Sequence, residues 1–436
     1  MEIITKNNIK KYSTYKNSGV EWLGEIPEHW DLGRLGSILN PVSSKNHPNK
    51  ILLSITREKG VIVRDIENED TNHNFIPDDL TGYKLLKKGQ FGMNKMKAWQ
   101  GSYGVSDYTG IVSPAYYTFE FTKDIEPKFF HIAIRSKLYV SFFGKASDGV
   151  RIGQWDLSKD RMKRIPLAIP PLSEQTKIAE FLDDKTKKID EAIAIKTQQI
   201  NLLKERKQIL IHKAVTRGLD TNVKLKNSGV EWIGEIPVHW EVKKVTHLFN
   251  KIGSGTTPTS GDNKYYDGKF NFLQTGDLND GKITKTKRTL KERAFKDFSS
   301  LKIYPKGSLV MAMYGATIGK LGILNIESAT NQACCIFIKS KKIETNYFFQ
   351  VLLAFRTEII SFGYGGGQPN ISQDLIKSLR FPIAPLSEQK EISSYIEKSS
   401  EKIAKAIGLK SEEISTLKEY KSSLINSVVT GKVRVC

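Results

Sequence analysis

The stretch Lys16-Asn-Ser-Gly-Val-Glu-Trp-Leu-Gly-Glu-Ile-Pro-Glu-His-Trp30 decides the architecture of this chain, because it returns almost unchanged as Lys226 to Trp240. The two copies differ only at Leu23/Ile233 and Glu28/Val238. A repeat of roughly 20–50 residues is typical of a solenoid, but this one recurs after about 210 residues, which is the size of a domain. The chain is therefore a tandem duplication of a domain-sized unit.

A second motif closes each half of the chain. Pro171-Leu-Ser-Glu-Gln175 and Pro385-Leu-Ser-Glu-Gln389 each precede a long segment with helical periodicity. The serine is a suitable N-cap, and a glutamate in the first turn of a helix interacts favourably with the helix dipole. The sequence therefore predicts two long helices, one after each motif.

Apolar residues in these two segments recur at alternating spacings of four and three, which is the seam of a coiled coil. The seam of the first helix comprises Leu182, Ile189, Ile193, Ile200, Leu203 and Leu210, and that of the second comprises Ile396, Ile403, Ile407, Ile414, Leu417 and Leu424. Lysines also occupy the same seam positions in both helices, at Lys196 and Lys207 and at Lys410 and Lys421. Antiparallel pairing of the two helices would bury both apolar stripes. It would also bring the chain ends together in a nearly circular, pseudo-twofold arrangement.

The segments between the shared motifs differ in sequence but keep a common order of elements. Ser308 to Tyr314 is expected to form a buried strand, followed by a turn and a return strand from Lys320 to Leu324. In the first half, Gln90 to Met96 aligns with that strand. Each half then continues into one apolar helix-like segment, Lys128 to Phe143 and Asn346 to Phe362. The two interiors are thus predicted to be diverged copies of one mixed α/β domain.

Composition narrows the class of partner. The chain has 436 residues, of which 39% are hydrophobic, so it can bury substantial cores. Lysine and arginine number 67 against 47 aspartate and glutamate, which gives a formal net charge of +20. Such an excess is typical of proteins that bind a polyanion such as nucleic acid. A solvated lysine-rich surface without such a partner is the alternative.

The sequence also predicts where the protein is located and how its cysteines are used. It has no uninterrupted run of about 18 apolar residues, and its first residues lack the apolar segment of a signal peptide, so we expect a cytoplasmic protein with no membrane contact. Cys334, Cys335 and Cys436 are too few and too badly spaced for a zinc site. The adjacent pair lies in the apolar run Ala333 to Ile338, which predicts a buried strand and no metal site.

No stretch of the chain carries a convincing catalytic motif. Gly315-Ala-Thr-Ile-Gly-Lys320 resembles a phosphate-binding loop, but one residue is missing before Gly-Lys, and Leu321 stands where Ser or Thr would bind magnesium. Pro170-Pro171 is followed by leucine, so the Asn/Asp/Ser-Pro-Pro-aromatic motif of an adenine methyltransferase is lacking. His29 and His239 recur in the repeat without a nearby Cys or Asp, which favours structural packing. We therefore expect no catalytic residues and no cofactor in this chain.

The duplicated Gly-Val-Glu-Trp-Leu/Ile-Gly-Glu-Ile-Pro-x-His-Trp openings, the paired Pro-Leu-Ser-Glu-Gln helix starts and the two unlike interiors together resemble the specificity subunits of type I restriction-modification systems. The resemblance covers essentially the whole chain. It implies an α+β protein with two α/β target recognition domains separated by two long antiparallel coiled-coil helices. The implied division is a first target recognition domain (1–165), a central conserved region with a spacer helix (166–221), a second target recognition domain (222–380) and a C-terminal conserved region (381–436).

The resemblance also implies a function. The two interiors look like different subtypes of the recognition domain, so the chain is expected to bind a bipartite, asymmetric double-stranded DNA site with one half-site per domain. It would position two methyltransferase subunits for adenine methylation, together with restriction subunits, without being an enzyme itself. S-adenosylmethionine would belong to the methyltransferase subunits, and ATP and magnesium to the restriction subunits.

Residue types on the loops then suggest the DNA contacts. Lysines and arginines should hold phosphates, while amide, aromatic and hydroxyl side chains read base edges. The candidates in the first domain are Lys95, Lys97, Trp99, Gln100, Arg151 and Gln154, and those in the second are Thr256, Thr257, Tyr314, Lys320, Gln368 and Asn370. For the two aromatic candidates, Trp99 and Tyr314, packing beneath the loop is the alternative.

The starts of the long helices are the candidate contacts for the methyltransferase subunits, namely Leu172, Glu174, Gln175, Leu386, Glu388 and Gln389. Two other classes of protein stay open at this point. A stand-alone bivalent DNA-binding protein would use the same two domains without these partners. A coiled-coil adaptor would use the same helices with domains that bind protein, although the basic charge and the unlike interiors argue against it.

Overall fold

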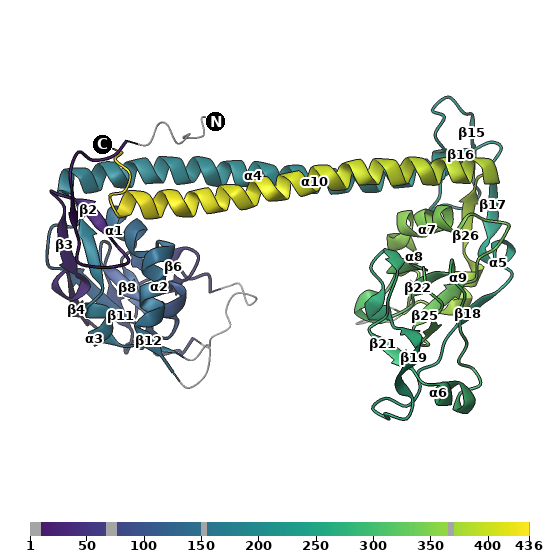
Figure 1. The fold of residues 1–436 in the computed structure, drawn as a ribbon, viewed down its shortest axis with the longest axis horizontal. Helices are drawn as coiled ribbons and strands as arrows, with labels where there is room; N and C mark the ends of the chain where they lie inside the picture. Colours follow the sequence, from purple (N-terminus) through teal and green to yellow (C-terminus); the bar gives the residue numbers. More distant parts are fainter. Residues whose placement is uncertain (1–9, 67–75, 150–154, 365–369, 436) are drawn as a thin grey trace. The chain divides into compact units, whose positions relative to one another are not determined.

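The computed structural model describes residues 10–66, 76–149, 155–364 and 370–435, and it divides into two compact units (Figure 1). Unit 1 comprises Met1–Thr197 and Ser411–Cys436, and unit 2 comprises Gln198–Lys410. Two long helices, α4 (Leu172–Arg217) and α10 (Leu386–Val429), each contribute one part to each unit. The compact units thus combine segments that are distant in the chain, and the linear boundaries given above stay predictions.

Both long helices begin directly after the proline of their motif, with Glu174 and Glu388 in the first turn. In unit 1 they run side by side in opposite directions (Figure 1), because Asp190 of α4 pairs with Lys421 of α10 at 2.6 Å and Lys196 pairs with Glu413. The seam residues of this part are buried or half-buried, namely Leu182, Ile189, Ile193, Ile414, Leu417 and Leu424. The antiparallel coiled coil expected from the sequence is confirmed.

The remaining parts of the same helices pack together in unit 2. Ile211 and Ala214 of α4 share a hydrophobic core with Ile392 and Ile396 of α10. The other seam residues here are buried or half-buried as well, namely Ile200, Leu203, Leu210, Ile403 and Ile407. The neighbouring exposed positions, such as Leu202, face solvent. The period of burial therefore follows the seam along both helices.

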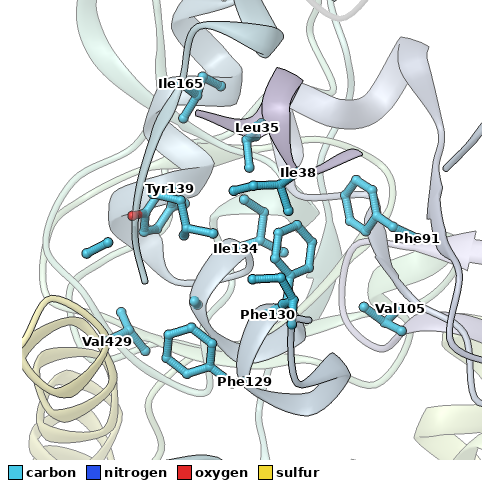
Figure 2. Packing of buried hydrophobic residues seen from close by; sticks show 14 of the residues in the cluster. Leu35, Ile38, Phe91, Val105, Phe129, Phe130, Ile134, Tyr139, Ile165 and Val429 are labelled. Carbon is cyan, nitrogen blue, oxygen red and sulfur yellow. The ribbon is translucent and has the colours of Figure 1, made fainter. Parts of the chain in front are cut away.

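The core of unit 1 is a four-stranded antiparallel sheet in the order β4 (Leu39–Val42), β11 (Tyr117–Phe121), β8 (Phe91–Met93) and β9 (Tyr103–Val105). Helices α1 (Pro127–Ile134) and α2 (Lys137–Lys145) pack on it through buried aromatic residues. Figure 2 shows this core, in which Phe129 of α1 and Val429 of α10 belong to the same cluster. The domain is thereby packed against the helix pair.

Unit 2 has the same arrangement with one strand added. Its sheet runs β18 (Ile252–Ser254), β25 (Cys334–Phe337), β22 (Leu309–Ala312), β23 (Leu321–Leu324) and β20 (Gly281–Ile283). The strand predicted at Ser308 to Tyr314 and its return strand are thus confirmed as β22 and β23. The buried strand predicted around the two cysteines is β25, whose residues are all buried.

One helix prediction was wrong in both halves. Each apolar segment forms two helices instead of one: α1 and α2 in unit 1, and α7 (Thr345–Ala354) and α8 (Arg356–Ser361) in unit 2. In unit 1 the break falls at Ser136, whose hydroxyl accepts a hydrogen bond from the Tyr139 amide and starts a new helix. Arg135 stabilises the break, because its guanidinium donates to four backbone carbonyls, including those of Gly101 and Tyr103.

The units differ most in what is attached to these sheets. Unit 1 carries the hairpin of β5 (Leu53–Thr56) and β6 (Gly60–Val63) and the pair of β7 (Lys84–Leu86) and β10 (Gly110–Val112). Unit 2 carries instead a three-stranded sheet of β21 (Arg288–Leu290), β19 (Tyr266–Leu273) and β24 (Ala329–Thr330), with α6 (Glu292–Asp297). These additions make the two interiors different subtypes of one fold.

The duplicated opening sequence folds identically in both units. In each unit a β-hairpin leads into a strand that pairs with the segment before the long helix. The hairpin consists of β1 (Tyr15–Asn17) and β2 (Glu25–Pro27) in unit 1, and of β15 (Leu225–Asn227) and β16 (Glu235–Pro237) in unit 2. These pairs are β3 (Asp31–Arg34) with β14 (Pro166–Ile169), and β17 (Glu241–Lys244) with β26 (Arg380–Ile383). The short elements β12 (Ser147–Asp148), β13 (Asp156–Leu157), α3 (Lys159–Lys163), α5 (Val245–Leu248) and α9 (Gln373–Ser378) complete the domains.

The two ends of the described chain meet in unit 1. The Arg434 amide donates to the Lys10 carbonyl at 2.8 Å, and the Arg434 guanidinium lies 5.9 Å from the centre of the Tyr12 ring. The corresponding place in unit 2 is a covalent connection, since α4 ends at Arg217 and the chain continues through Gly218 to β15. This agrees with the circular course expected from the duplication.

Candidate nucleic-acid interface

The shared motifs form a buried joint at the start of each long helix. In unit 1 the Glu174 carboxylate accepts a hydrogen bond from the Trp30 indole at 2.8 Å and lies 2.8 Å from Nε2 of His29. Trp30 itself is fully buried. The recurring histidine therefore has a structural partner, a glutamate far away in the sequence, and is not a metal ligand in this arrangement.

Unit 2 repeats this joint atom for atom. Glu388 accepts from the Trp240 indole at 3.0 Å and lies 2.6 Å from Nε2 of His239. Sequence reasoning assigned the two histidines to packing but missed their glutamates. The signal was present, because each of the three residue types occurs at matching places in both duplicated motifs.

The next residue of each motif makes a second joint. The buried Gln175 side chain donates to the Pro170 carbonyl at 2.9 Å and accepts from the Glu126 amide at 2.9 Å. Glu126 in turn caps α1 through the Phe129 amide. Buried polar groups need such partners, so this amide connects the long helix to the first domain helix.

Gln389 makes the same bonds in unit 2, to the Ala384 carbonyl at 2.7 Å and from the Glu344 amide at 2.8 Å. Four of the six residues proposed to contact methyltransferase subunits are therefore engaged inside the chain. The other two, Leu172 and Leu386, are 49% and 46% exposed. These leucines are the members of the set that present apolar surface to solvent.

The DNA-binding candidates of the first domain gather on one short segment. Lys95, Lys97, Trp99 and Gln100 all lie on the 3-10 helix η3 (Lys95–Gln100), which follows β8 and begins at the N-cap Asn94. Lys97 is exposed, whereas Lys95 is half-buried and pairs with Asp156 at 2.7 Å. Of this group, Lys97 is the lysine whose charge is free to meet a phosphate.

Trp99 packs against Trp155, with ring centroids 5.2 Å apart, and its buried indole nitrogen has no hydrogen-bond partner among the described residues. Arg151 and Gln154, the other two candidates, lie outside the described residues. Trp155 and Asp156, which follow in the sequence, both contact η3. Sequence reasoning missed both contact residues, although they stand in the motif Gln154-Trp-Asp-Leu-Ser158.

The candidates of the second domain lie at the equivalent end of its sheet. Tyr314 follows β22 and forms a β-bridge with Asn370, which exchanges two backbone hydrogen bonds with Tyr364. Lys320 is exposed in the turn before β23, after the 3-10 helix η5 (Gly315–Thr317). Gln368 lies outside the described residues. The structure thus brings Tyr314 and Asn370 together.

Thr256 and Thr257 lie beside this group, after β18. The Thr256 hydroxyl is 2.8 Å from that of Ser300, and the Thr257 hydroxyl donates to the Gln332 side chain. Gln332 precedes Ala333, whose carbonyl accepts from the Met313 amide at 2.8 Å. Because β18, β22 and β25 are antiparallel neighbours, the end of β18, the end of β22 and the start of β25 meet at one edge.

The described residues also bear on metal binding and membrane insertion. Among the described residues, no group of three or more His, Cys, Asp or Glu side chains is placed to hold a metal ion. Within the same residues, no helix is both long and apolar enough to cross a membrane. Burial raises the pKa of Cys334 to about 12, so this thiol is a core residue and not a reactive one.

The chain contains two copies of one sheet-and-helix domain, and both are joined in the same way to a shared pair of helices. The copies differ in the side chains at the equivalent sheet edge. This arrangement defines a duplicated scaffold protein with two unlike recognition surfaces. The model of the type I restriction modification DNA specificity domain matches this chain twice, at residues 27–205 and 237–414. The chain belongs to this family, that of the non-catalytic specificity subunits of type I restriction-modification systems.

Relatives support the assignment over the whole length. A Methanocaldococcus jannaschii chain that carries the name of the type I restriction enzyme MjaX specificity subunit is 26% identical over 433 residues, covering 95% of this chain and 96% of its own. The type I restriction enzyme MjaVIII specificity subunit of the same organism is 29% identical over 315 residues, or 69% of each chain. The resemblance noted from the sequence is confirmed.

Solved structures agree with the fold. A chain from a structure of complex assembly and conformational transition of the type I R-M system has a TM-score of 0.72 at 15% identity, with 93% of this chain and 98% of that chain covered. The HsdS subunit from Thermoanaerobacter tengcongensis has a TM-score of 0.56 at 15% identity, with 94% and 98% covered. At this identity the likeness concerns the fold alone.

Proposed function

We propose that this specificity subunit binds a bipartite, asymmetric double-stranded DNA site, with one half-site per domain. The observation that supports this proposal is the contrast at the equivalent sheet edge. There, β8 leads into the lysine-rich and tryptophan-containing η3, whereas β22 leads into Tyr314 and a glycine turn. Different side chains at the same place on one scaffold would read different base edges.

The division of labour within each domain follows from chemistry. Lysines such as Lys97 and Lys320 are exposed and would supply salt-dependent contacts to phosphates. Asn370 and Gln100 carry amides, whose geometry suits bidentate pairing with adenine. Thr256 and Thr257 would contribute hydroxyl contacts. The other members of the proposed set of base and phosphate contacts are Lys95, Trp99, Arg151, Gln154, Tyr314 and Gln368.

The α4/α10 pair would fix the number of unread base pairs between the half-sites. Half-sites on one face of B-DNA lie about one turn, roughly 34 Å, apart. Inserting the same few residues into both helices should therefore change the spacer and leave both half-sites as they are. Retention of the parental spacer by such a variant would contradict this part of the proposal.

The subunit would work with protein partners. We propose that the starts of α4 and α10, with the exposed Leu172 and Leu386, lie at contacts with two methyltransferase subunits that modify adenine, and that restriction subunits join the complex. S-adenosylmethionine would be bound by the methyltransferase subunits, and ATP and magnesium by the restriction subunits. Such a complex would act on chromosomal and incoming DNA in the cytoplasm.

The experiment that tests this function is a genome-wide map of adenine methylation by single-molecule sequencing. It compares a host that expresses this chain with its encoded neighbouring methyltransferase against a host that expresses the methyltransferase alone. We expect a new split, asymmetric motif only when this chain is present. If no new motif appears although the chain binds DNA, the protein is a stand-alone bivalent DNA-binding protein instead.

A further inference from the structure

A small basic cavity in unit 1 lies beside the proposed DNA contacts and belongs to none of them. It has a volume of about 170 Å³ and is lined by residues of the paired strands β4 and β11, together with Ser43, Lys84 and Lys159. This is the same end of the sheet from which η3 begins, because Tyr117 of β11 is paired with Met93 of β8.

The two lysines are held in place by groups that carry no negative charge. The half-buried Lys84 ammonium donates to the Tyr116 carbonyl at 2.7 Å. The Lys159 ammonium lies 4.3 Å from the centre of the Tyr117 ring, which is a cation–π contact. Neither a carbonyl nor an aromatic ring neutralises a positive charge, and no carboxylate is among the described residues that line this cavity.

The local electrostatics are correspondingly unbalanced. Burial lowers the pKa of Lys84, and the positive charges of Lys159, Lys45 and Lys95 lower it further. Among the described residues, Lys95 is the one of these lysines with an acidic partner, Asp156 at 2.7 Å. Like charges gathered around one site are unfavourable unless an anion joins them. The cavity is therefore suited to an anion of small size.

The second domain lacks this cluster at the equivalent place. Strand register aligns Pro41 with Ile252, because each faces an equivalent phenylalanine, Phe119 or Phe337. By the same register, Thr256 stands in place of Lys45 and Met313 in place of Lys95. The first residue of α9 is Gln373 where α3 has Lys159. Only Lys84 has a lysine counterpart, the exposed Lys302.

We propose that Lys84 and Lys159 form a phosphate-binding site in the first domain that holds one backbone phosphate of the DNA half-site read by η3. The inference rests on the proposed DNA binding and adds a specific contact to it. Lysine is a point charge that holds a phosphate without reading sequence. The site would thus fix the position of the duplex in the first domain, while the second domain uses other contacts.

The test compares the full-length double variant Lys84→Gln/Lys159→Gln with the parent and with Lys302→Gln, the matched control in unit 2. Binding of a random-sequence 30-base-pair duplex is measured between about 50 and 200 mM salt. Each phosphate contact contributes about 0.9 to the slope of log affinity against log salt. We expect the slope to fall by about one in the double variant, with a three- to tenfold loss of affinity at about 150 mM salt.

Two further variants keep the result interpretable. Lys302→Gln should leave the slope as in the parent, and Lys84→Arg/Lys159→Arg should restore it, because both arginines keep their charge. An unchanged slope in a double glutamine variant with the parental melting temperature overturns the site. If that variant does not fold, the single variant Lys159→Gln, which changes an exposed residue, is measured by the same criterion.

Adding inorganic phosphate distinguishes whether the cavity binds a phosphate of the DNA backbone or free phosphate. If phosphate raises the melting temperature of the parent but not of the double variant, while the duplex slope is unchanged, the cavity binds free phosphate and the assignment to DNA is overturned. If the parent does not bind the duplex at all, the proposed function fails, and the assignment fails with it. Loss of slope in the variant with binding retained in the parent supports both.

Discussion

Glu174 in unit 1 and Glu388 in unit 2 each accept a hydrogen bond from a tryptophan indole and lie beside a histidine, whereas the sheet edges of the two units share register and little else. In each joint a fully buried tryptophan donates to a partly buried carboxylate, so removal of the carboxylate leaves a buried donor without its partner. The sheet edges are exposed and free of that constraint. The comparison shows how one duplicated scaffold can keep its construction while its two recognition surfaces diverge.

The helix pair shows a second, smaller difference between the units. In unit 1 the seam lysines Lys196 and Lys421 pair with Glu413 and Asp190. The equivalent lysines of unit 2, Lys410 and Lys207, have no ion pair among the described residues, and Ala404 takes the place of Asp190. Lys207 instead lines a cavity of about 370 Å³ beside the second domain.

The largest expected effect comes from removing the buried indole of either joint. Trp30→Ala and Trp240→Ala each delete a fully buried side chain and remove the indole donor from a glutamate. We expect each to cost about 3–5 kcal/mol of unfolding free energy. Hydrogen exchange measured by mass spectrometry should place the loss in the unit that carries the substitution. A loss restricted to one of the two variants would break the equivalence of the joints.

Acid should destabilise unit 1 through a residue that unit 2 lacks. Burial, with the nearby Arg135 charge, lowers the pKa of His131 from 6.5 to about 4, and its Nδ1 accepts from the Val105 amide at 3.2 Å. The His131 imidazole is therefore protonated below about pH 6.5 in the unfolded chain but only below about pH 4 in the folded chain. The contribution of His131 to the free energy of unfolding is therefore fully present above about pH 6.5 and falls by about 3 kcal/mol as the pH is lowered to about 4.

Strand and helix register place Phe349 at the corresponding position of unit 2, so the comparison predicts acid sensitivity in unit 1 alone. Calorimetric unfolding between pH 4 and 8 measures it, with His131→Gln as the matched variant. Glutamine has no charge to gain, so the difference in stability between variant and parent should shift in favour of the variant as the pH falls. A pH-independent difference would contradict the assignment.

The second joint should cost less than the first. Gln175→Leu and Gln389→Leu keep the approximate volume of the side chain but leave an amide and a carbonyl buried without partners. We expect a loss of about 1–3 kcal/mol for either variant. Urea denaturation of the full chain measures it, and faster exchange at the start of α1 or α7 should accompany the loss. Equal exchange in parent and variant at those helix starts would contradict a joint at this position.

The smallest expected effect concerns the difference between the seam lysines of the helix pair in unit 1 and in unit 2. Ala404→Asp places a carboxylate opposite Lys207, as Asp190 stands opposite Lys421. Because these side chains are partly exposed, the gain should be no more than about 1 kcal/mol and should fade in high salt. Asp190→Ala is the matched loss. Thermal unfolding at low and high salt measures both, and a destabilising Ala404→Asp would show that the two seams differ in more than charge.

Much of the fold could be predicted from the sequence, because the duplication repeats the same pattern of motifs and periodicity in both halves of the chain. The seam spacing, the strand from Ser308 to Tyr314 and the buried cysteines depend on local periodicity. The break between α1 and α2 does not, because it depends on Arg135 meeting carbonyls of β9 and of the β5–β6 turn, which are distant in the sequence. Glu174 and His29 likewise meet only through the fold, and Trp155 was recognisable only as part of a motif.

The composition of the two compact units has a consequence for how the protein is made. Unit 2 is one continuous stretch, Gln198–Lys410, whereas unit 1 needs Ser411–Cys436 to complete its core around Leu424, Val428 and Val429. During synthesis, which proceeds from the N-terminus, the first domain is translated first but remains without its covering helix until α10 has emerged. The half of the protein that is encoded first is therefore finished last, and until then its exposed apolar surface is where a chaperone would bind.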